Sequence, residues 1–331
     1  MGQKEKLSFE ASYTLDILCF IDILLKRSPN LEDEKIKIFT DMLSTKSEKC
    51  LRKLEKSLPK RELIQNLIIP LIVADSEFKG LKTEEILGNP DYLINQFKKS
   101  SSYKKMPTKS KKFVQKEAKK VIESLEIIVS DLERLDFKAF WLMNQLPIIK
   151  QRIKEYQSEI YPLHLIEQLN NWTAPQFLIE KKELFVLSFS QNNFSSLLNG
   201  TNYISTQLHS DRIIRSLIEA AFASYSLNKE LKPFIKTFKK NKAFIQTFKT
   251  VKKEHKKITT YLQSNLLLAV TTYLKEQFQV LENPHEYLST YRRGSHKLAI
   301  LFYEHMKHSP KPEAQPLNQY LTEVLEQVDL Y

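Results

Sequence analysis

The chain has 331 residues, of which 42% are hydrophobic and 27% charged, and this composition excludes a disordered or collagen-like protein. Only 5 glycines are present, too few for a fold rich in tight turns or for a glycine-rich nucleotide loop, so mainly helical structure is predicted. The net charge of +12 favours weak attraction to anions, and two cysteines make neither a disulfide framework nor a zinc cluster.

The N-terminal segment contains no apolar stretch of the kind found in signal peptides. The most apolar run, residues 15–25, includes Asp16 and Asp22 and is too short and too charged to span a bilayer. Cys19 lies inside this run and is predicted to be a buried small hydrophobe. We therefore expect a cytoplasmic protein without a membrane span.

The first third of the chain is predicted to form a helical N-terminal subdomain, residues 1–112. The spacing of apolar residues and a start signal at Asn89-Pro90 predict helices over 10–26, 34–57 and 62–78, and from residue 90 onward. The last part of this region, Lys98–Lys112, carries seven lysines and no acidic residue. Such a stretch is typical of a solvated linker, so a domain boundary is expected at its end.

The next helix has a regular apolar seam. Its apolar residues recur in alternating steps of four and three: Val114, Ala118, Val121, Leu125, Ile128, Leu132 and Leu135. This pattern is compatible with a coiled coil, but it favours a helix packed on its own domain, because the neighbouring segments are also helical. The helix over 137–161 that follows is interrupted at Pro147.

A short β element is predicted within residues 176–206. The run Phe185-Val186-Leu187 is short and apolar and predicts a strand, and a turn containing Gly200 leads to a second extended stretch. Helices are predicted after it over 209–226, 230–257, 258–281, 295–307 and 316–328. The expected fold is therefore mainly α with a small β-sheet, an α+β fold, whose second domain comprises residues 113–331.

The helix over 209–226 has the position of a zinc-binding helix but not its ligands. Zinc peptidases present two histidines at i and i+4 on one helix face, with a glutamate between them that activates the metal-bound water. The corresponding residues here are Ile218, Glu219 and Phe222. Ile218 and Phe222 have no donor atoms, and they are also the residues that an ordinary packed helix would carry.

The order of these segments resembles a family of bacterial gluzincin-like metallopeptidases. The stretch 8–24 is similar to the opening helix of that family, and 181–205 resembles the edge strand and hairpin that cover its substrate. The stretch 261–274 resembles the helix that delivers the third zinc ligand, where this chain has Ser264 or, one residue earlier, Gln263. All three ligands thus depart from the family's pattern.

The resemblance implies a zincin-like scaffold without zinc, that is, a catalytically inactive pseudopeptidase with no cofactor. Such a protein would bind a peptide or protein in the cleft that holds the substrate in active members of the family. The bound peptide would add as a strand to an exposed edge formed by Leu184, Val186, Ser188 and Ser190, opposite the helix that carries Ile218 and Phe222.

A second candidate metal site is the histidine-rich C-terminal region. His305 and His308 are three residues apart on a predicted helix and could share a face. The alternative is that they are surface histidines at a helix end, where a cation is favourable beside the last carbonyl groups.

Two further functions remain open. The first is a basic helical protein that contacts nucleic acid through Lys98–Lys112 and Lys236–Lys257, the second of which has nine lysines. The phenylalanines in that segment fall opposite most of the lysines, so they are predicted to be core rather than base-stacking residues. The second alternative is a hydrolase whose site the known motifs do not describe.

Overall fold

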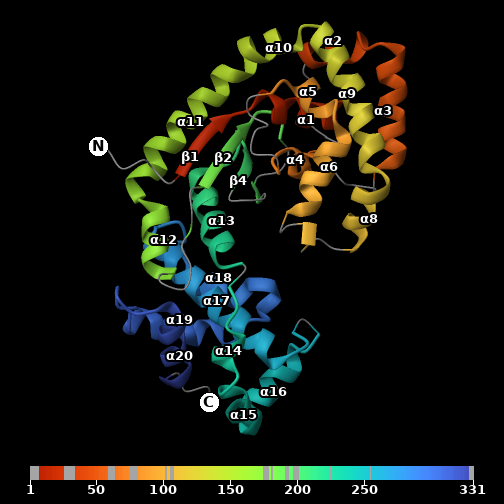
Figure 1. The fold of residues 1–331 in the computed structure, drawn as a ribbon. Helices are drawn as coiled ribbons and strands as arrows, with labels where there is room; N and C mark the ends of the chain where they lie inside the picture. The colour runs from red at the N-terminus through yellow and green to blue at the C-terminus, as the bar shows by residue number, and fades with distance from the viewer. Residues whose placement is uncertain are drawn as a thin grey trace. The chain divides into compact units, whose positions relative to one another are not determined.

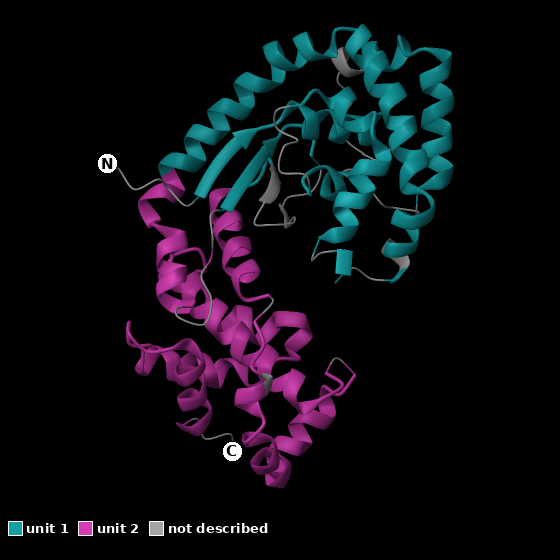
Figure 2. Ribbon diagram, viewed as in Figure 1, with its two compact units in different colours: residues 1–158, 181–208 teal, residues 159–180, 209–331 magenta. Residues whose placement is uncertain are grey.

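A computed structural model describes residues 7–25, 34–58, 64–74, 81–100, 103–104, 108–173, 179, 182–190, 194–196, 201–223, 225–253 and 255–327. The chain divides into two compact units, which Figure 2 distinguishes by colour. The first contains residues 1–158 and 181–208, and the second contains residues 159–180 and 209–331. None of the helices in the described part is long and apolar enough to cross a bilayer.

The first unit combines a small sheet with a layer of helices. Its helices are α1 (Tyr13–Leu24), α2 (Glu34–Asp41), α3 (Thr45–Ser57), α4 (Ile64–Ile72), α5 (Thr83–Leu87), α6 (Pro90–Lys99), α8 (Thr108–Lys116), α9 (Ala118–Arg134), α10 (Phe137–Phe140), the π-helical turn η2 (Trp141–Gln145) and α11 (Leu146–Ile160), whose last two residues lie in the second unit. The seam helix α9 packs against α3, α5, α6 and α8. Its predicted apolar face is buried, so the prediction of a helix packed within its own domain is confirmed.

Four strands form the sheet in the order β1-β2-β4-β3. They are β1 (Leu7–Ala11), β2 (Lys182–Leu187), β3 (Phe194–Ser196) and β4 (Thr201–Ser205). Strands β1 and β4 both run parallel to β2, and β3 is antiparallel to β4. Leu184, Phe185, Val186 and Leu187 are all buried, so both faces of β2 are covered, which explains why this strand is a continuous apolar run rather than an alternating one.

Strand β1 was not predicted, and it changes the expected sheet. Residues 10–26 were predicted as one helix, but the chain is extended up to Ala11 and α1 begins only at Tyr13, after the N-cap Ser12. Leu7 and Phe9 are buried while Ser8 and Glu10 are half-buried, the two-residue period of a strand. Because β1 pairs with β2 along its length, the sheet joins segments more than 170 residues apart.

A buried carboxylate joins α1 to the end of β2. Asp16 is fully buried and accepts hydrogen bonds from Trp141 Nε1 (2.7 Å), Ser188 Oγ (2.6 Å) and the Phe189 backbone N–H (2.9 Å). Burial raises the pKa of this carboxyl above its ordinary value, although the three donors oppose the shift. One side chain therefore ties together three segments of the first unit.

Aromatic side chains fill the core beside this carboxylate. Phe20, Phe39, Phe137 and Phe189 form a cluster in which the Phe20 and Phe137 ring centroids are 4.4 Å apart. Helix α11 runs along β1 in Figure 1, and its Tyr156 packs on Phe9 with centroids 5.4 Å apart. Cys19 is fully buried, as predicted.

The second unit is built of helices around α17. Its members are η3 (Tyr161–Leu163), α12 (Leu165–Thr173), α13 (Ser210–Phe222), α14 (Asn228–Leu231), α15 (Phe234–Lys240), α16 (Lys242–Thr250), α17 (Ile258–Gln277), α18 (Pro284–Thr290), η5 (Tyr291–Gly294), α19 (Ala299–His308) and α20 (Leu317–Gln327). Helix α17 contacts α13, α14, α18 and α19. Most of its residues are buried, as expected for a helix surrounded by others.

Two predicted long helices are shorter in the structure because polar caps divide them. Ser44 accepts a hydrogen bond from the Ser47 backbone N–H and begins α3, so 34–57 is two helices. Asn241 accepts from the Phe244 N–H at 2.9 Å and begins α16, so 230–257 contains α15 and α16 rather than one helix.

The chain does not divide at the predicted boundary. Residue 112 lies within α8, which packs on α9 in the first unit, and the stretch 98–112 includes the end of α6 and the start of α8. Of that stretch, residues 101–102 and 105–107 lie outside the described residues. The sheet, predicted for the second domain, belongs to the first unit, because its edge strand β1 comes from the N-terminus.

Candidate functional sites

The expectation that Ile218 and Phe222 line an open cleft is wrong. Ile218 is completely buried and Phe222 is 1% exposed, within a helix that packs on α12 and α17 of the same unit. The spacing of four residues places both on the inward face of α13, together with Ile214 and Leu217. These side chains are core residues of the second unit.

Ser264 and Gln263, the predicted positions of the third zinc ligand, do not contact the stretch of α13 that contains Ile218 and Phe222. Ser264 donates to the Tyr261 carbonyl (3.0 Å) and lies 3.4 Å from His255 Nδ1, while Gln263 bonds to the backbone of Tyr225. The residue of α17 that reaches Glu219 is Lys275, eleven positions further along. At 1.5 Å per residue, Ser264 and Lys275 are about 16 Å apart along the helix axis. The motif positions on α13 and Ser264 therefore do not converge on a common metal site.

Glu219 forms an ion pair with a buried lysine instead of standing free. Lys275 is 2% exposed, whereas the Glu219 side chain is 56% exposed. The Lys275 ammonium also donates to Tyr287 Oη at 3.1 Å and lies 4.8 Å from the centre of that ring. Burial and the Glu219 charge raise the pKa of Tyr287, so this hydroxyl stays protonated. The glutamate therefore neutralises a lysine that the fold has removed from water.

Removal of Glu219 should destabilise the protein more than removal of Lys275. We expect Glu219→Ala to lower the free energy of unfolding by about 1–2 kcal/mol, because it leaves an ammonium buried without its carboxylate. The value is below that of a fully buried pair, since water reaches Glu219. Lys275→Met should cost less than about 1 kcal/mol, because it leaves a carboxylate that water can solvate.

Urea unfolding followed by circular dichroism measures both variants, and Arg212→Ala, an exposed position on the same helix, serves as the control. A loss for Lys275→Met equal to or greater than that for Glu219→Ala would contradict this account of the pair.

A buried pair of histidines was missed by the sequence reasoning. His255 and His296 are 4% and 3% exposed, and their ring centroids are 4.8 Å apart. Burial, and then the neighbouring His255, lower the pKa of His296 to about 4, so it is neutral at pH 7. The sequence around His255 consists of lysine and glutamate and indicates an exposed turn, so no signal pointed to this pair.

The histidines at the end of α19 are not assembled with other donors. The His308 ring nitrogen Nδ1 lies 2.8 Å from the Glu304 carbonyl, and His285 pairs with the Glu304 carboxylate at 2.9 Å. Across the residues that the structure describes, no three side chains of His, Cys, Asp or Glu are placed to hold a metal ion. His308 is therefore a histidine at the end of a helix, which was the alternative to a metal site for His305 and His308.

The predicted peptide-binding edge is not an edge. Leu184 and Val186 are completely buried in β2, which has β1 on one side and β4 on the other. Beyond the strand, Ser188 donates to Asp16 and Ser190 is buried. Both hydrogen-bonding sides of β2 are already used, so a peptide cannot add to it.

The strongest charge concentration lies in the second unit, within residues 229–257, which we call the lysine segment. It contains only two acidic residues, Glu230 and Glu254, so its net charge is +9. Its eleven lysines are all exposed: Lys229, Lys232, Lys236, Lys239, Lys240, Lys242, Lys249, Lys252, Lys253, Lys256 and Lys257. None of them forms an ion pair with a described residue.

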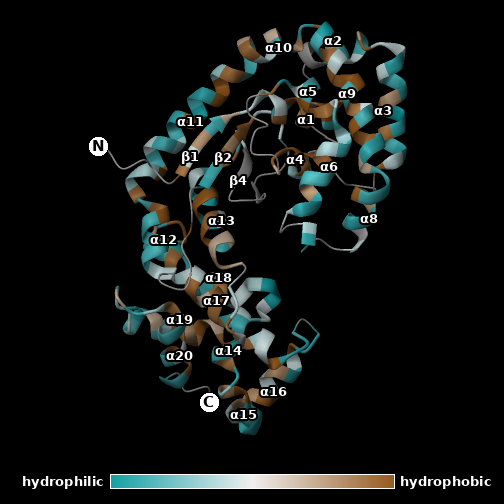
Figure 3. Cartoon of the chain, in the orientation of Figure 1, coloured by the Kyte–Doolittle hydropathy of each residue, from teal (hydrophilic) through white to brown (hydrophobic). Residues whose placement is uncertain are grey.

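Most of the apolar residues of the lysine segment are buried, as predicted, whereas Phe234 and Ile245 are half-buried. Phe238, Phe244 and Phe248 are buried, and Phe238 and Phe244 stack with centroids 5.1 Å apart. Figure 3 shows hydrophilic and hydrophobic residues mixed along α15 and α16. The phenylalanines anchor these short helices, and the lysines remain in solvent without carboxylates to neutralise them.

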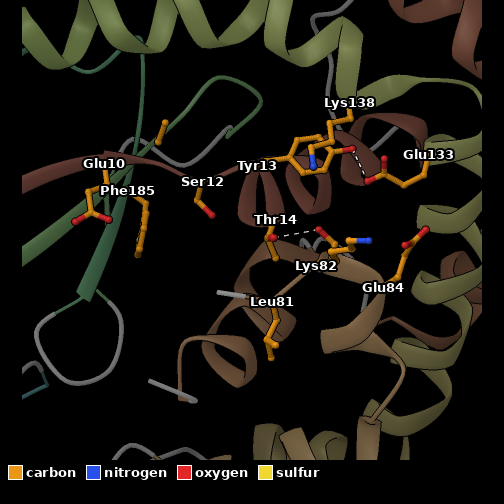
Figure 4. Close-up of a pocket in the computed structure, with 12 residues that line it drawn as sticks. Glu10, Ser12, Tyr13, Thr14, Leu81, Lys82, Glu84, Glu133, Lys138 and Phe185 are labelled. Atoms are coloured by element: carbon orange, nitrogen blue, oxygen red, sulfur yellow. Dashed lines mark hydrogen bonds between the residues drawn. The ribbon is translucent and has the colours of Figure 1, made fainter. Parts of the chain in front are cut away.

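A polar cavity of about 600 Å³ lies in the first unit at the carboxyl end of β1. Figure 4 shows its walls, which come from residues 10–14, residues 81–84, Glu133, Lys138 and Phe185. The carboxyl ends of parallel strands are where open α/β sheets bind ligands. No local pattern in the sequence indicates this cavity, because the segments that form it are far apart in the chain.

Comparison with known proteins gives no match among family models, curated proteins or solved structures. The resemblance to gluzincin-like metallopeptidases stays a hypothesis drawn from the order of segments.

Proposed function

We propose that this protein binds the phosphate backbone of double-stranded nucleic acid through the lysine segment. The observation that carries the proposal is the set of eleven exposed lysines with no ion-pair partner among the described residues. Phosphates attract such cations and release their condensed counterions on binding, which supplies most of the affinity in non-specific complexes.

The chemistry of the segment favours backbone contact over base reading. It contains no arginine, the side chain that best recognises base edges. Three of its four phenylalanines, Phe238, Phe244 and Phe248, are buried and cannot stack on successive unpaired bases, as single-strand binding requires. Binding is therefore independent of sequence, and a duplex is preferred to a single strand.

A nucleic acid fits this segment better than an anionic membrane. Peripheral membrane helices insert apolar side chains below the lipid headgroups. The large hydrophobic residues that are exposed in the described part of the chain all belong to the first unit. The lysine segment has charge for a membrane surface but no exposed apolar side chain to anchor there.

The salt dependence of duplex binding tests the proposal. The test variant replaces four exposed lysines with glutamine: Lys236, Lys239, Lys240 and Lys249. The matched control makes the same change at four exposed lysines of α3: Lys46, Lys49, Lys53 and Lys56. Fluorescence anisotropy with a labelled 25-base-pair duplex measures the dissociation constant from 50 to 200 mM salt.

We expect log K to fall steeply with log salt in the wild type. The slope becomes shallower by about 0.9 for each phosphate contact that the test variant loses, while the control keeps the wild-type slope. Absence of duplex binding at 50 mM salt would refute the proposal. So would equal losses in the two variants, or binding to phosphatidylserine vesicles without binding to duplex.

The pseudopeptidase hypothesis rests on the order of segments in the sequence. As a statement about ancestry it predicts no metal in the purified protein, and zinc that stays bound in stoichiometric amount after dialysis would contradict it. It does not supply a cleft, because Ile218 and Phe222 are core residues.

A further inference from the structure

The cavity at the end of β1 contains charges of both signs that are not paired with one another. Lys82 and Lys138 line it together with Glu84 and Glu133. In the described part of the chain, neither lysine forms an ion pair, and no ion pair involves either glutamate. Lys82 and Lys138 are exposed and the two glutamates are half-exposed, so all four charges are available to a ligand that enters the cavity.

We propose that this cavity binds a small zwitterion that carries one free ammonium and one free carboxylate group, namely an amino acid or a peptide of two or three residues. The glutamates receive the ammonium and the lysines receive the carboxylate, each through a charge-assisted hydrogen bond. The volume of about 600 Å³ lies within the usual range of small-molecule sites.

The hydrogen bonds in the cavity wall support this assignment. Tyr13 donates its hydroxyl to Glu133 at 2.8 Å, and the Lys138 ammonium lies 5.7 Å from the Tyr13 ring centre. Burial and then Glu133 raise the pKa of Tyr13, so the hydroxyl keeps its proton and holds the carboxylate in place. Figure 4 shows these three side chains grouped on one wall of the cavity.

The remaining walls provide room for an apolar side chain. Leu81 and Phe185 line the cavity across from this group in Figure 4, and Thr14 and Thr83 share a hydrogen bond of 3.0 Å between their hydroxyls. A site that presents ammonium groups, carboxylate groups and an apolar wall matches the parts of an amino acid. It lies in the first unit, so it does not depend on the lysine segment or on nucleic-acid binding.

Calorimetric titration of the intact protein tests the proposal. The probes are the twenty amino acids and a series of Xaa-Ala dipeptides, each at up to about 10 mM, followed by the N-acetylated and the C-amidated form of the best ligand. We expect at least one probe to bind, and we expect each blocked form to bind at least tenfold more weakly, because it lacks one of the two charges.

Two substitutions test the contacts to the ammonium and to the carboxylate of the ligand separately. Glu84→Gln should weaken binding of the free zwitterion at least fivefold and leave that of the N-acetylated form nearly unchanged, and Lys138→Gln should do the converse with the C-amidated form. Lys138 is exposed and Glu84 half-exposed, so both variants should fold. Lys150→Gln, exposed on α11 and not part of the cavity wall, is the control.

The proposal is overturned if no probe binds, if the blocked forms bind as tightly as the free zwitterion, or if Lys150→Gln weakens binding as much as Lys138→Gln. None of these outcomes bears on duplex binding by the lysine segment, which is measured separately.

Discussion

Phe222→Ala should lower the free energy of unfolding by about 3–5 kcal/mol, the range observed when a buried phenylalanine is truncated in a core that cannot collapse around the space. Phe222 is 1% exposed and lies on the face of α13 that packs within the second unit. Urea unfolding followed by circular dichroism measures the loss. The substitution also distinguishes a core helix from a degenerate cleft, because truncating a cleft residue would cost little.

The control is Phe234→Ala, which removes the same atoms from a half-buried position of the same unit and should cost clearly less. The pair Ile218→His and Phe222→His, which would restore two zinc donors one turn apart, should instead unfold the second unit, since it buries two imidazoles without partners. A stable double variant that binds zinc would show that α13 borders an open site and that the packing described above is wrong.

Asp16→Ala should also destabilise the protein strongly, by about 2–4 kcal/mol at pH 7. The substitution leaves the Trp141 indole, the Ser188 hydroxyl and the Phe189 N–H buried without an acceptor. Each unsatisfied donor costs about 1–3 kcal/mol, and the removal of a buried carboxylate offsets part of the sum. Asp16→Asn should cost less, because its amide oxygen can still accept from some of these donors.

The contribution of Asp16 should decrease as the pH rises. Burial raises the pKa of this carboxyl in the folded state above the ordinary value of 3.8. The folded state therefore holds the proton more tightly than the unfolded chain does. This stabilisation is complete below the unfolded pKa and is lost as the pH rises through the folded pKa.

Urea unfolding of wild type and Asp16→Asn from pH 4 to pH 8 measures this dependence. The stability of the wild type relative to the variant should fall across that range. An increase with pH would mean that the three hydrogen bonds outweigh burial and that the carboxyl is ionised in the fold at all of these values. Ser130→Ala, an exposed position on α9, is the control for general effects of pH on stability.

The sequence predicted local structure well where the signal was periodic. The seam of α9 has buried Val121, Leu125, Ile128 and Leu132 at the expected spacing, because burial on one helix face requires apolar residues every three or four positions. Between residues 236 and 257 the same helical spacing predicts lysines on the outer face and phenylalanines on the inner one, and Phe238, Phe244 and Phe248 are buried. The short apolar run Phe185-Val186-Leu187 likewise predicted a strand, and it forms the end of β2.

Sequence reasoning failed where a local pattern had two physical explanations. An apolar pair at i and i+4, such as Ile218 and Phe222, occurs in a degenerate metal site and in any packed helix. Likewise, a short apolar strand such as β2 can lie at an edge or in the centre of a sheet. The choice depends on the neighbours, and for β2 the deciding neighbour is β1, which is more than 170 residues away in the chain.

By itself, the sequence determined the helical character of the protein, the inward and outward faces of its periodic helices, and the concentration of lysines near residue 240. These properties depend on residues close to one another in the chain. The division into two units, the burial of Asp16 and Lys275, and the cavity beside Tyr13 were decided only by the tertiary structure. They arise from segments brought together in space, and no local periodicity records which carboxylate meets which donor or which charges share a cavity.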